Sequence, residues 1–191
     1  MRKIVFDIET RNFFHDVGKN DPALLDIAVI VIHDSETDEY SSYLENELNT
    51  LWPIIERADM LIGYNSDHFD IPLLNKYYPG DLSKIKSLDI LNEIKNSYGR
   101  RMKLDQVAEG TLGRGKTGHG ADAMTWWKQG LYEKVRDYCL EDVRITKEVY
   151  DYARTHNKLL FKESGKLNEI PLDTSEWEKP NDNKLTFTLP F

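Results

Sequence analysis

The amino-acid sequence predicts a mixed α/β fold. Three observations support this class. The chain has 191 residues, the length of one ordinary domain with a short appendage. Strand-like segments fill its first third, and strand–helix units follow them. Its composition, 40% hydrophobic and 30% charged, is that of a globular protein and excludes wholesale disorder. We therefore expect one compact domain over residues 1–160 and a C-terminal extension over 161–191.

The strand-like segments begin close to the N-terminus. Residues 3–6 contain an apolar run without alternation, which predicts a central strand covered on both faces. Residues 24–33 are rich in β-branched side chains and form the strongest strand pattern. A polar turn at 34–38 leads into 40–44, so these two segments are expected to pair antiparallel. A short strand is expected at 60–62, where a glycine ends it.

Helical periodicity dominates the chain after residue 48. Helices are expected over residues 48–58, 72–78, 90–98, 104–112, 121–129 and 131–155. The polar segment 11–21 is expected to be a loop. From residue 162 the chain becomes polar and proline-punctuated, and the alternating run 185–189 is expected to form one last strand. The whole extension 161–191 is expected to fold back as an edge strand or to dock on a partner.

Composition also narrows the function classes. A single cysteine, Cys139, excludes an intrachain disulfide and a multi-cysteine zinc site. The longest apolar run, residues 27–32, is too short to span a membrane, and no signal segment is visible at the start, so we expect a cytoplasmic protein. The net charge of −8 argues against broad coating of a nucleic-acid duplex, although a narrow nucleic-acid site remains compatible with it.

Two acids follow the expected central strand. Asp7 stands at its carboxyl end and Glu9 comes two residues later, so an extended chain places both carboxylates on one face. Such a pair is a set of hard oxygen ligands for a divalent cation at the edge of a sheet where α/β proteins build their sites. The alternative is that both acids are solvated residues of a loop.

A third acid interrupts the apolar stripe of the longest expected helix. Steps of three and four residues carry this stripe through Asp142, and a buried carboxylate is costly unless it is paired or bound to a metal. Tyr138 lies one turn earlier on the same side. The alternative is a simple Tyr–Asp hydrogen bond. The apolar members of the stripe are Leu131, Val135, Tyr138, Ile145, Val149 and Tyr152.

A fourth acid, Asp70, precedes Pro72 after the strand that ends at Gly63. Its alternative role is a helix N-cap, whereas the neighbouring Asp67 and His68 are expected to be solvated. Asp7, Glu9, Asp70 and Asp142 cannot all remain ionised together without cations. We therefore expect two divalent ions, roughly 3.5–4 Å apart, one converting water into hydroxide and the other stabilising a leaving oxygen. Oxygen-only ligation favours Mg²⁺ or Mn²⁺ over zinc.

Three segments that carry these acids resemble sequence motifs of one enzyme family. Residues 6–10 (FDIET) look like the first motif of the DEDD 3′–5′ exonucleases. Residues 63–74 resemble the second motif as found in proofreading domains of family B DNA polymerases. Residues 138–142 are similar to the third motif, Tyr-x-x-x-Asp. The tyrosine indicates the DEDDy subclass, because the histidine subclass would need His at position 137, which is Asp137.

The resemblance covers about residues 1–155 and implies an RNase H-like mixed five-stranded sheet with an antiparallel ribbon. It also implies release of 3′-terminal nucleotides as 5′-monophosphates. On this reading the four acids are metal ligands. Tyr138 orients or helps to deprotonate the attacking water, and polarisation by the metals contributes most of the deprotonation, since a phenol is a poor base alone. Three further residues match positions that line the pocket of the terminal nucleotide: Thr10, Asn65 and Phe69.

A competing motif occurs at residues 110–117, which match the P-loop pattern G-x-x-x-x-G-K-[ST] letter for letter. A P-loop must follow a buried strand and open a helix, whereas residues 103–109 have helical periodicity. We therefore reject nucleotide hydrolysis. The same stretch also resembles a helix–Leu-Gly-x-Gly-Lys segment of polymerase-type exonuclease domains.

A basic segment, residues 95–119, stands out in this acidic chain. We expect Lys103, Arg114 and Lys116 to grip the backbone of a single strand, with Tyr98, Trp126 or Trp127 as stacking faces. The alternative is a solvated loop beside core tryptophans. The basic residues are Lys95, Arg100, Arg101, Lys103, Arg114 and Lys116.

The expected partner is single-stranded DNA rather than RNA. No polymerase domain follows in this sequence, so three settings are expected alternatives: action alone, service to a separate polymerase, or work with a repair or processing protein. A nucleic-acid-binding module without catalysis and an exoribonuclease remain the alternatives.

Overall fold

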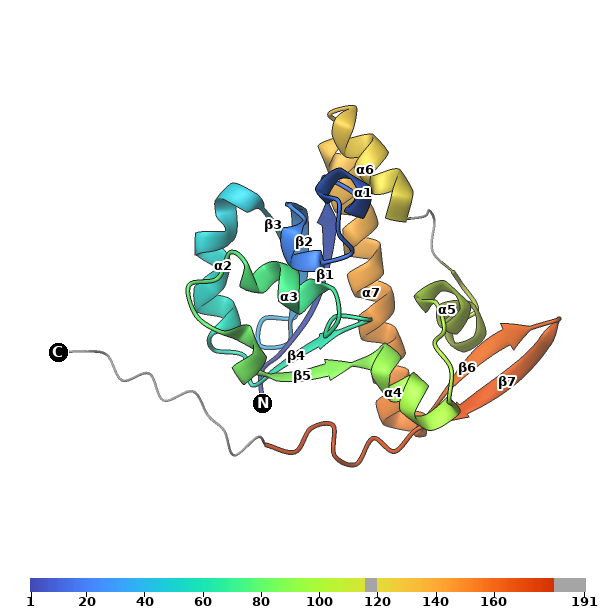
Figure 1. Cartoon of the computed structure of the whole chain (residues 1–191). Helices are drawn as coiled ribbons and strands as arrows, with labels where there is room; N and C mark the ends of the chain where they lie inside the picture. The colour runs from blue at the N-terminus through green and yellow to red at the C-terminus, as the bar shows by residue number, and fades with distance from the viewer. Residues whose placement is uncertain (116–119, 181–191) are drawn as a thin grey trace.

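A five-stranded mixed sheet forms the centre of the molecule (Figure 1). The computed structural model describes residues 1–115 and 120–180. The strand order is β3-β2-β1-β4-β5; β1 pairs antiparallel with β2 and parallel with β4, β2 and β3 are antiparallel, and β4 and β5 are parallel. The expected mixed sheet with an antiparallel ribbon is confirmed. Its strands are β1 Lys3–Thr10, β2 Ile27–Asp34, β3 Glu39–Leu44, β4 Met60–Gly63 and β5 Lys86–Asp89.

Strand β1 lies in the middle of the sheet and is covered on both faces, as its unbroken apolar run predicts. Successive side chains of a strand point to opposite faces. Val5 packs into the core on the side of the long C-terminal helix, whereas Ile4, Phe6 and Ile8 pack into the core on the other side. Asp7 therefore shares a face with Val5 and points toward the long helix.

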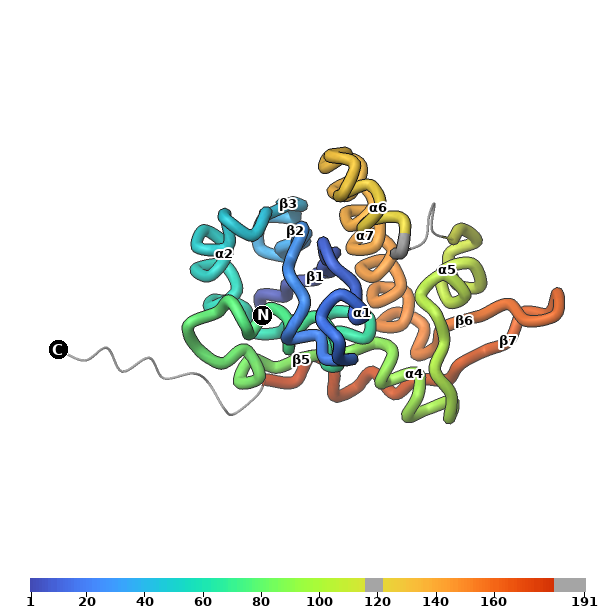
Figure 2. The backbone as a smooth tube through the Cα atoms, turned by 45° about the horizontal axis from the view of Figure 1, so that its top comes forward, coloured from blue at the N-terminus to red at the C-terminus, as the bar shows by residue number. Residues whose placement is uncertain are grey.

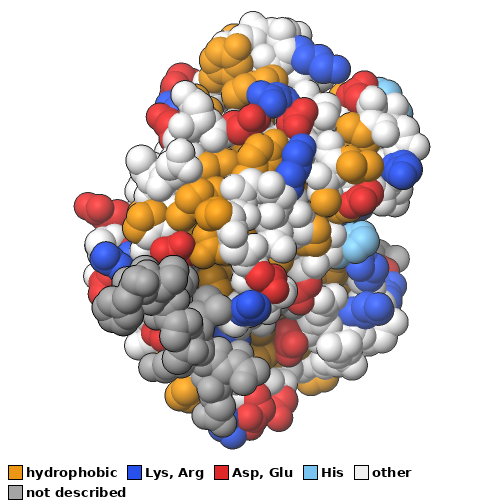
Figure 3. Space-filling model, turned by 60° about the vertical axis from the view of Figure 1, so that its left-hand side comes forward, with side chains coloured by type: hydrophobic (Ala, Val, Ile, Leu, Met, Phe, Trp, Pro, Cys, Tyr) orange, Lys and Arg blue, Asp and Glu red, His pale blue; other side chains and the backbone are white. Residues whose placement is uncertain are grey.

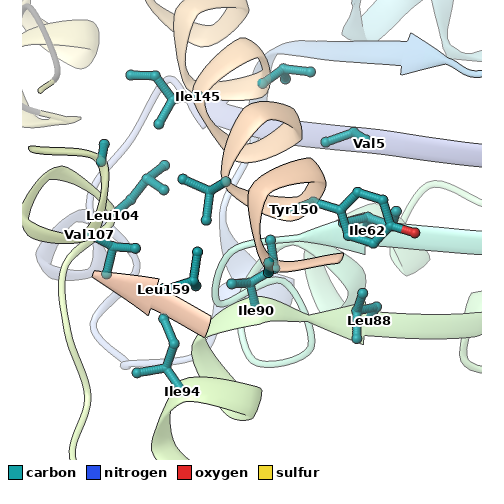
Figure 4. Packing of buried hydrophobic residues seen from close by; sticks show 14 of the residues in the cluster. Val5, Ile62, Leu88, Ile90, Ile94, Leu104, Val107, Ile145, Tyr150 and Leu159 are labelled. Atoms are coloured by element: carbon teal, nitrogen blue, oxygen red, sulfur yellow. The ribbon is translucent and has the colours of Figure 1, made fainter. Parts of the chain in front are cut away.

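Helices cover both faces of the sheet, and the longest, α7 (Tyr132–His156), packs on β1 and β2 (Figures 1 and 4). Helices α2 and α3 supply buried side chains to the opposite face. The other α-helices are α1 Phe14–Val17, α2 Leu48–Ile55, α3 Asp70–Asn75, α4 Ile90–Tyr98, α5 Leu104–Leu112 and α6 Gly120–Lys128. Short 3₁₀ helices occur at Pro22–Leu24, Glu45–Glu47 and Leu82–Lys84.

Several expected boundaries need correction. Strand β1 continues to Thr10, the loop 11–21 contains α1, and α3 begins at Asp70 rather than at Pro72. Strand β5 was not expected, because its four residues are only partly apolar. Leu131 does not belong to the buried stripe of α7: it precedes the first turn and is 46% exposed.

The chain after α7 forms a β-hairpin, in a region for which the sequence predicts a polar extension that folds back as an edge strand or docks on a partner. Strands β6 (Lys158–Glu163) and β7 (Lys166–Pro171) form a separate two-stranded sheet that packs on α5 (Figure 2). Leu159, Phe161 and Ile170 join the core on the α7 side. The division into residues 1–160 and 161–191 stays a prediction, and the expected strand 185–189 lies outside the described residues.

The hairpin also explains a glycine of the P-loop-like sequence. Gly110 lies inside α5 rather than after a strand, which supports the rejection of a P-loop. A Cβ atom at this position would lie 2.4 Å from the Cα of Phe161 and 2.6 Å from the carbonyl oxygen of Leu160. Glycine is therefore required for the close approach of α5 to β6, and not for binding a phosphate.

The molecule presents mixed charge on its surface. On the face shown in Figure 3, acidic and basic side chains lie interspersed among apolar ones rather than as one basic stripe. No helix in the described part of the chain is long and apolar enough to cross a membrane.

The segment after β7 is tied to the domain through Glu178. Its carboxylate accepts hydrogen bonds from the Lys3 ammonium (2.7 Å), the Tyr150 hydroxyl (2.6 Å) and the Arg154 guanidinium (2.9 Å). These donors, led by Lys3, lower the pKa of Glu178 to about 2. A carboxyl whose pKa is lowered on folding stabilises the protein at pH values above its unfolded-state pKa, and this contribution is lost as the pH falls.

We expect Glu178→Gln to lower the free energy of unfolding by about 1–2 kcal/mol at pH 7. This value is reduced because Glu178 and its charged partners are partly exposed. The difference from wild type is expected to stay constant above pH 5 and to shrink as the pH falls below about 4.5 toward about 2. Urea unfolding between pH 7 and pH 3 measures this. Glu176→Gln is the control, since its partner Lys179 is exposed; an equal effect of both variants at pH 7 would contradict the assignment.

Candidate metal centre

Three carboxylates from distant parts of the chain meet at one point. Ligand oxygens of Asp7, Glu9 and Asp142 all lie within 4.8 Å of one another. Asp7 and Glu9 are half-buried, and Asp142 is only 2% exposed. Carboxylate oxygens are the ligands that Mg²⁺ and Mn²⁺ prefer, so this donor set fits a hard divalent cation. The three acids predicted from strand and helix periodicity are therefore brought together.

Strand β1 and helix α7 hold this cluster in place. The β1–β2 register shifts between Glu9 and Thr10, an irregularity that re-aims side chains at a strand end. Cys139 lies beneath the cluster, completely buried, with its Sγ 3.3 Å from the backbone oxygen of Asp7. Burial and the negative charges of the acids raise the pKa of this thiol, so it stays protonated as a small packing group. No sequence pattern predicts this role of Cys139.

Asp70 lies next to the cluster but is not among the three residues whose oxygens meet within 4.8 Å. It is 4% exposed, and its Oδ1 accepts a hydrogen bond from the backbone N–H of Ile8 at 3.1 Å. Burial first, and then the charge of Asp7, raise the pKa of its carboxyl. Asp70 is the first residue of α3 rather than its N-cap, which is Phe69. It therefore joins β1 to α3 beside the three clustered carboxylates.

Tyr138 faces the cluster from the turn of α7 before Asp142. It is 5% exposed and shares a hydrogen bond with the Asp142 carboxylate. Burial, followed by the charges of Asp142, Glu9 and Asp7, raises the pKa of the phenol well above its ordinary value. Trp126 packs edge-on against its ring, with centroids 5.9 Å apart. The hydroxyl is therefore a fixed, protonated hydrogen-bonding group in the absence of a cation.

The three pocket residues implied by the resemblance lie near the carboxyl ends of β1 and β4. Thr10 is buried, and its hydroxyl donates to the backbone oxygen of Asn12. Asn65 follows β4 in the left-handed region, with φ 68°. Phe69 is half-buried and packs edge-on against Phe14.

The basic residues are placed less uniformly than the sequence suggests. Lys103 is exposed at the start of α5. Arg114 forms ion pairs with Glu141 and Glu148 on α7, so part of its charge is already compensated. Lys116 lies outside the described residues. Of the expected stacking faces, Tyr98 is 38% exposed but is covered in part by Phe161, and Trp126 and Trp127 are half-buried.

Asp89, a residue that the sequence reading missed, organises the turn after β4. Its Oδ1 accepts hydrogen bonds from the backbone N–H groups of Asn65 (2.8 Å) and Leu91 (2.9 Å), so it caps α4 and fixes the turn at once. The side chain is 3% exposed, and burial raises its pKa. The sequence signal that could have identified this cap is an aspartate placed between a strand-like segment and a helical pattern.

A central mixed sheet with clustered acids at the end of its first strand defines a class of metal-dependent α/β domains. The family model described as RNase H superfamily matches residues 4–154. The chain therefore belongs to the RNase H superfamily and has its fold. This membership supports nuclease activity with divalent metals as the general character of the domain.

Among solved structures, the chain is similar to the family B DNA polymerase from the hyperthermophilic archaeon Pyrobaculum calidifontis. The TM-score is 0.60 at 17% sequence identity, and the match covers 81% of this chain but only 24% of the polymerase. The likeness is therefore one of fold, over a fraction of the polymerase. No curated protein matches this chain.

We expect Asp7→Asn to raise the thermal unfolding temperature of the metal-free protein by about 3–8 °C, because it relieves repulsion among close carboxylates. The same variant is expected to lose most of the stabilisation that Mn²⁺ gives the wild type. Thermal unfolding with EDTA and with Mn²⁺ measures both effects. Asp137→Asn, which removes one exposed charge from the same helix, is the matched control. An unchanged Mn²⁺ shift in Asp7→Asn would argue against a metal at this cluster.

Proposed function

We propose that this protein is a two-metal-ion 3′–5′ exonuclease of the DEDDy subclass, acting on single-stranded DNA or frayed 3′ ends and releasing nucleoside 5′-monophosphates. The observation that carries the proposal is the meeting of Asp7, Glu9 and Asp142 within 4.8 Å beside Tyr138. RNase H superfamily membership and the fold shared with a family B DNA polymerase support it.

The metal ligands in this proposal are Asp7, Glu9, Asp70 and Asp142. Bound divalent cations, Mg²⁺ or Mn²⁺, supply positive charge that offsets the carboxylates, acidifies water and stabilises the leaving oxygen. Asp70 is the member farthest from the meeting point of the other three. Burial and the negative charge of Asp7 raise the pKa of its carboxyl. A bound cation would offset the charge of Asp7 and so favour the ionised form of Asp70.

The role of Tyr138 in this proposal is to orient the attacking water. Its hydroxyl is held by the hydrogen bond with Asp142, and its ring is fixed by Trp126. A phenol is a poor base alone, so the metals supply most of the acidification of the water and the Tyr138 hydroxyl serves to position it.

The substrate strand in this proposal runs past Thr10, Asn65 and Phe69 toward the carboxylates. Lys103, Arg114 and Lys116 are the proposed backbone contacts, with Arg114 weakened by its acidic partners. DNA is preferred over RNA, which agrees with the DNA polymerase relative. A separate polymerase or repair protein is the proposed protein partner. The alternatives are a binding module without catalysis and an exoribonuclease.

Incubation of 5′-labelled single-stranded DNA with the protein in Mg²⁺ or Mn²⁺ tests the proposal. We expect a ladder of products shortened from the 3′ end, and nucleoside 5′-monophosphates as the released species. A matched oligonucleotide with a blocked 3′ end is the polarity control, and matched RNA tests the sugar preference. Equal degradation of the blocked and open oligonucleotides would refute exonuclease polarity.

Substitutions at the cluster separate its roles. We expect Asp142→Asn to lower kcat at least ~1,000-fold, because it removes a ligand and a charge that stabilise the transition state. Tyr138→Phe is expected to cost less, about 10–100-fold, because the carboxylates stay in place. Asp137→Asn on the same helix is expected to leave the rate unchanged. A loss in Tyr138→Phe as large as in Asp142→Asn would show that the hydroxyl does more than orient water.

A further inference from the structure

The segment after α4 contacts the turn after β4 through two consecutive pairs of residues. The Tyr64 hydroxyl donates a hydrogen bond to the backbone oxygen of Met102 at 2.8 Å. The Arg101 guanidinium donates one to the side-chain oxygen of Asn65. These contacts connect segments 36 and 38 residues apart in sequence, and they lie beside the Asn65 position already proposed to line the substrate pocket.

The chemistry of Arg101 fixes which way the Asn65 amide points. A guanidinium has only donors, so Asn65 must offer its oxygen, and the NH₂ end of the amide is left to donate elsewhere. The backbone of Asn65 is fixed as well, by the hydrogen bond to Asp89 and by a left-handed conformation that asparagine tolerates. Asn65 is thus presented as an oriented donor.

The direction of the neighbouring side chains places two positive charges together. Met102 is 5% exposed, whereas Arg101 and Lys103 on either side of it are exposed. Arg101 and Lys103 therefore both place positive charge at the surface, on either side of the buried Met102. Asn65 lies at the Arg101 end of this short basic row.

We propose that Arg101 is a positioning and backbone-contact residue for the substrate strand: it holds the Asn65 amide so that its NH₂ group donates to an acceptor of the strand, and it places its own charge against a phosphate. This inference rests on the proposed function. It adds a residue that the motif resemblance does not assign, and it implies that the strand enters over the segment 101–103.

The adjacent Arg100 provides a matched control. It has the same charge and is also exposed, but its guanidinium pairs with Glu163 at 2.8 Å and lies over the Phe161 ring, 5.1 Å from the centroid. Arg100 therefore faces the β6–β7 hairpin rather than Asn65. Neutralising either arginine changes the net charge equally, so a difference between them reports position and not total charge.

The experiment compares Arg101→Gln with Arg100→Gln. With single-stranded DNA in Mn²⁺, Arg101→Gln is expected to raise KM about tenfold while kcat changes by less than about threefold. In an Asp142→Asn background without metal, oligonucleotide binding by fluorescence anisotropy is expected to show a salt-dependence slope lowered by about 0.7, the value of one lost phosphate contact. Arg100→Gln is expected to change neither quantity.

A double variant tests action through Asn65. If Arg101 orients the amide, the double variant Asn65→Ala/Arg101→Gln is expected to raise KM by less than the product of the two single-variant increases. Equal effects of Arg100→Gln and Arg101→Gln, or full additivity with an unchanged slope, overturn the inference. A wild-type protein that releases no mononucleotide overturns the proposed function instead, and the anisotropy slopes then decide the Arg101 inference alone.

Discussion

The electrostatic repulsion among Asp7, Glu9 and Asp142 is the constraint on which the site depends. Two ionised carboxylates 4.8 Å apart repel by about 3 kcal/mol at an effective dielectric constant of about 20. Wherever no cation offsets these charges, the surrounding structure must oppose the repulsion or a carboxylate must take up a proton.

The sheet provides that opposition because its central strand is fixed from every side. Strand β1 has hydrogen-bonded neighbours on both edges and apolar cores on both faces. The strand fixes the backbone positions of Asp7 and Glu9, and α7, a helix of 25 residues, fixes that of Asp142, so the carboxylates can separate only by changing their side-chain rotamers. The site is thus held by burial far from the charges, and Asp70 reinforces it locally by accepting the N–H of Ile8.

The features predictable from the sequence are those encoded over a few residues. A spacing of two along a strand placed Asp7 with Glu9, and a helical stripe marked Asp142 as buried. Long-range partners left no such signal: Glu178 binds Lys3 across the whole chain, and Arg114 meets Glu141 and Glu148 only after α5 packs on α7. The strands β5, β6 and β7 were missed because their mixed polar pattern becomes a strand only through pairing and packing on α4 and α5.

The distribution of compensated charge also argues for a narrow substrate path. Arg114 is bound by two carboxylates and Arg100 by Glu163, so much of the basic segment serves to hold the fold together. Arg101 differs because its partner is the uncharged Asn65 amide, which leaves its charge uncompensated by that contact. In a chain of net charge −8, a short row of positive charge attracts a backbone only where it runs close to the protein. The single strand proposed to pass Asn65 meets that condition, whereas a duplex lying across the mixed-charge surface does not.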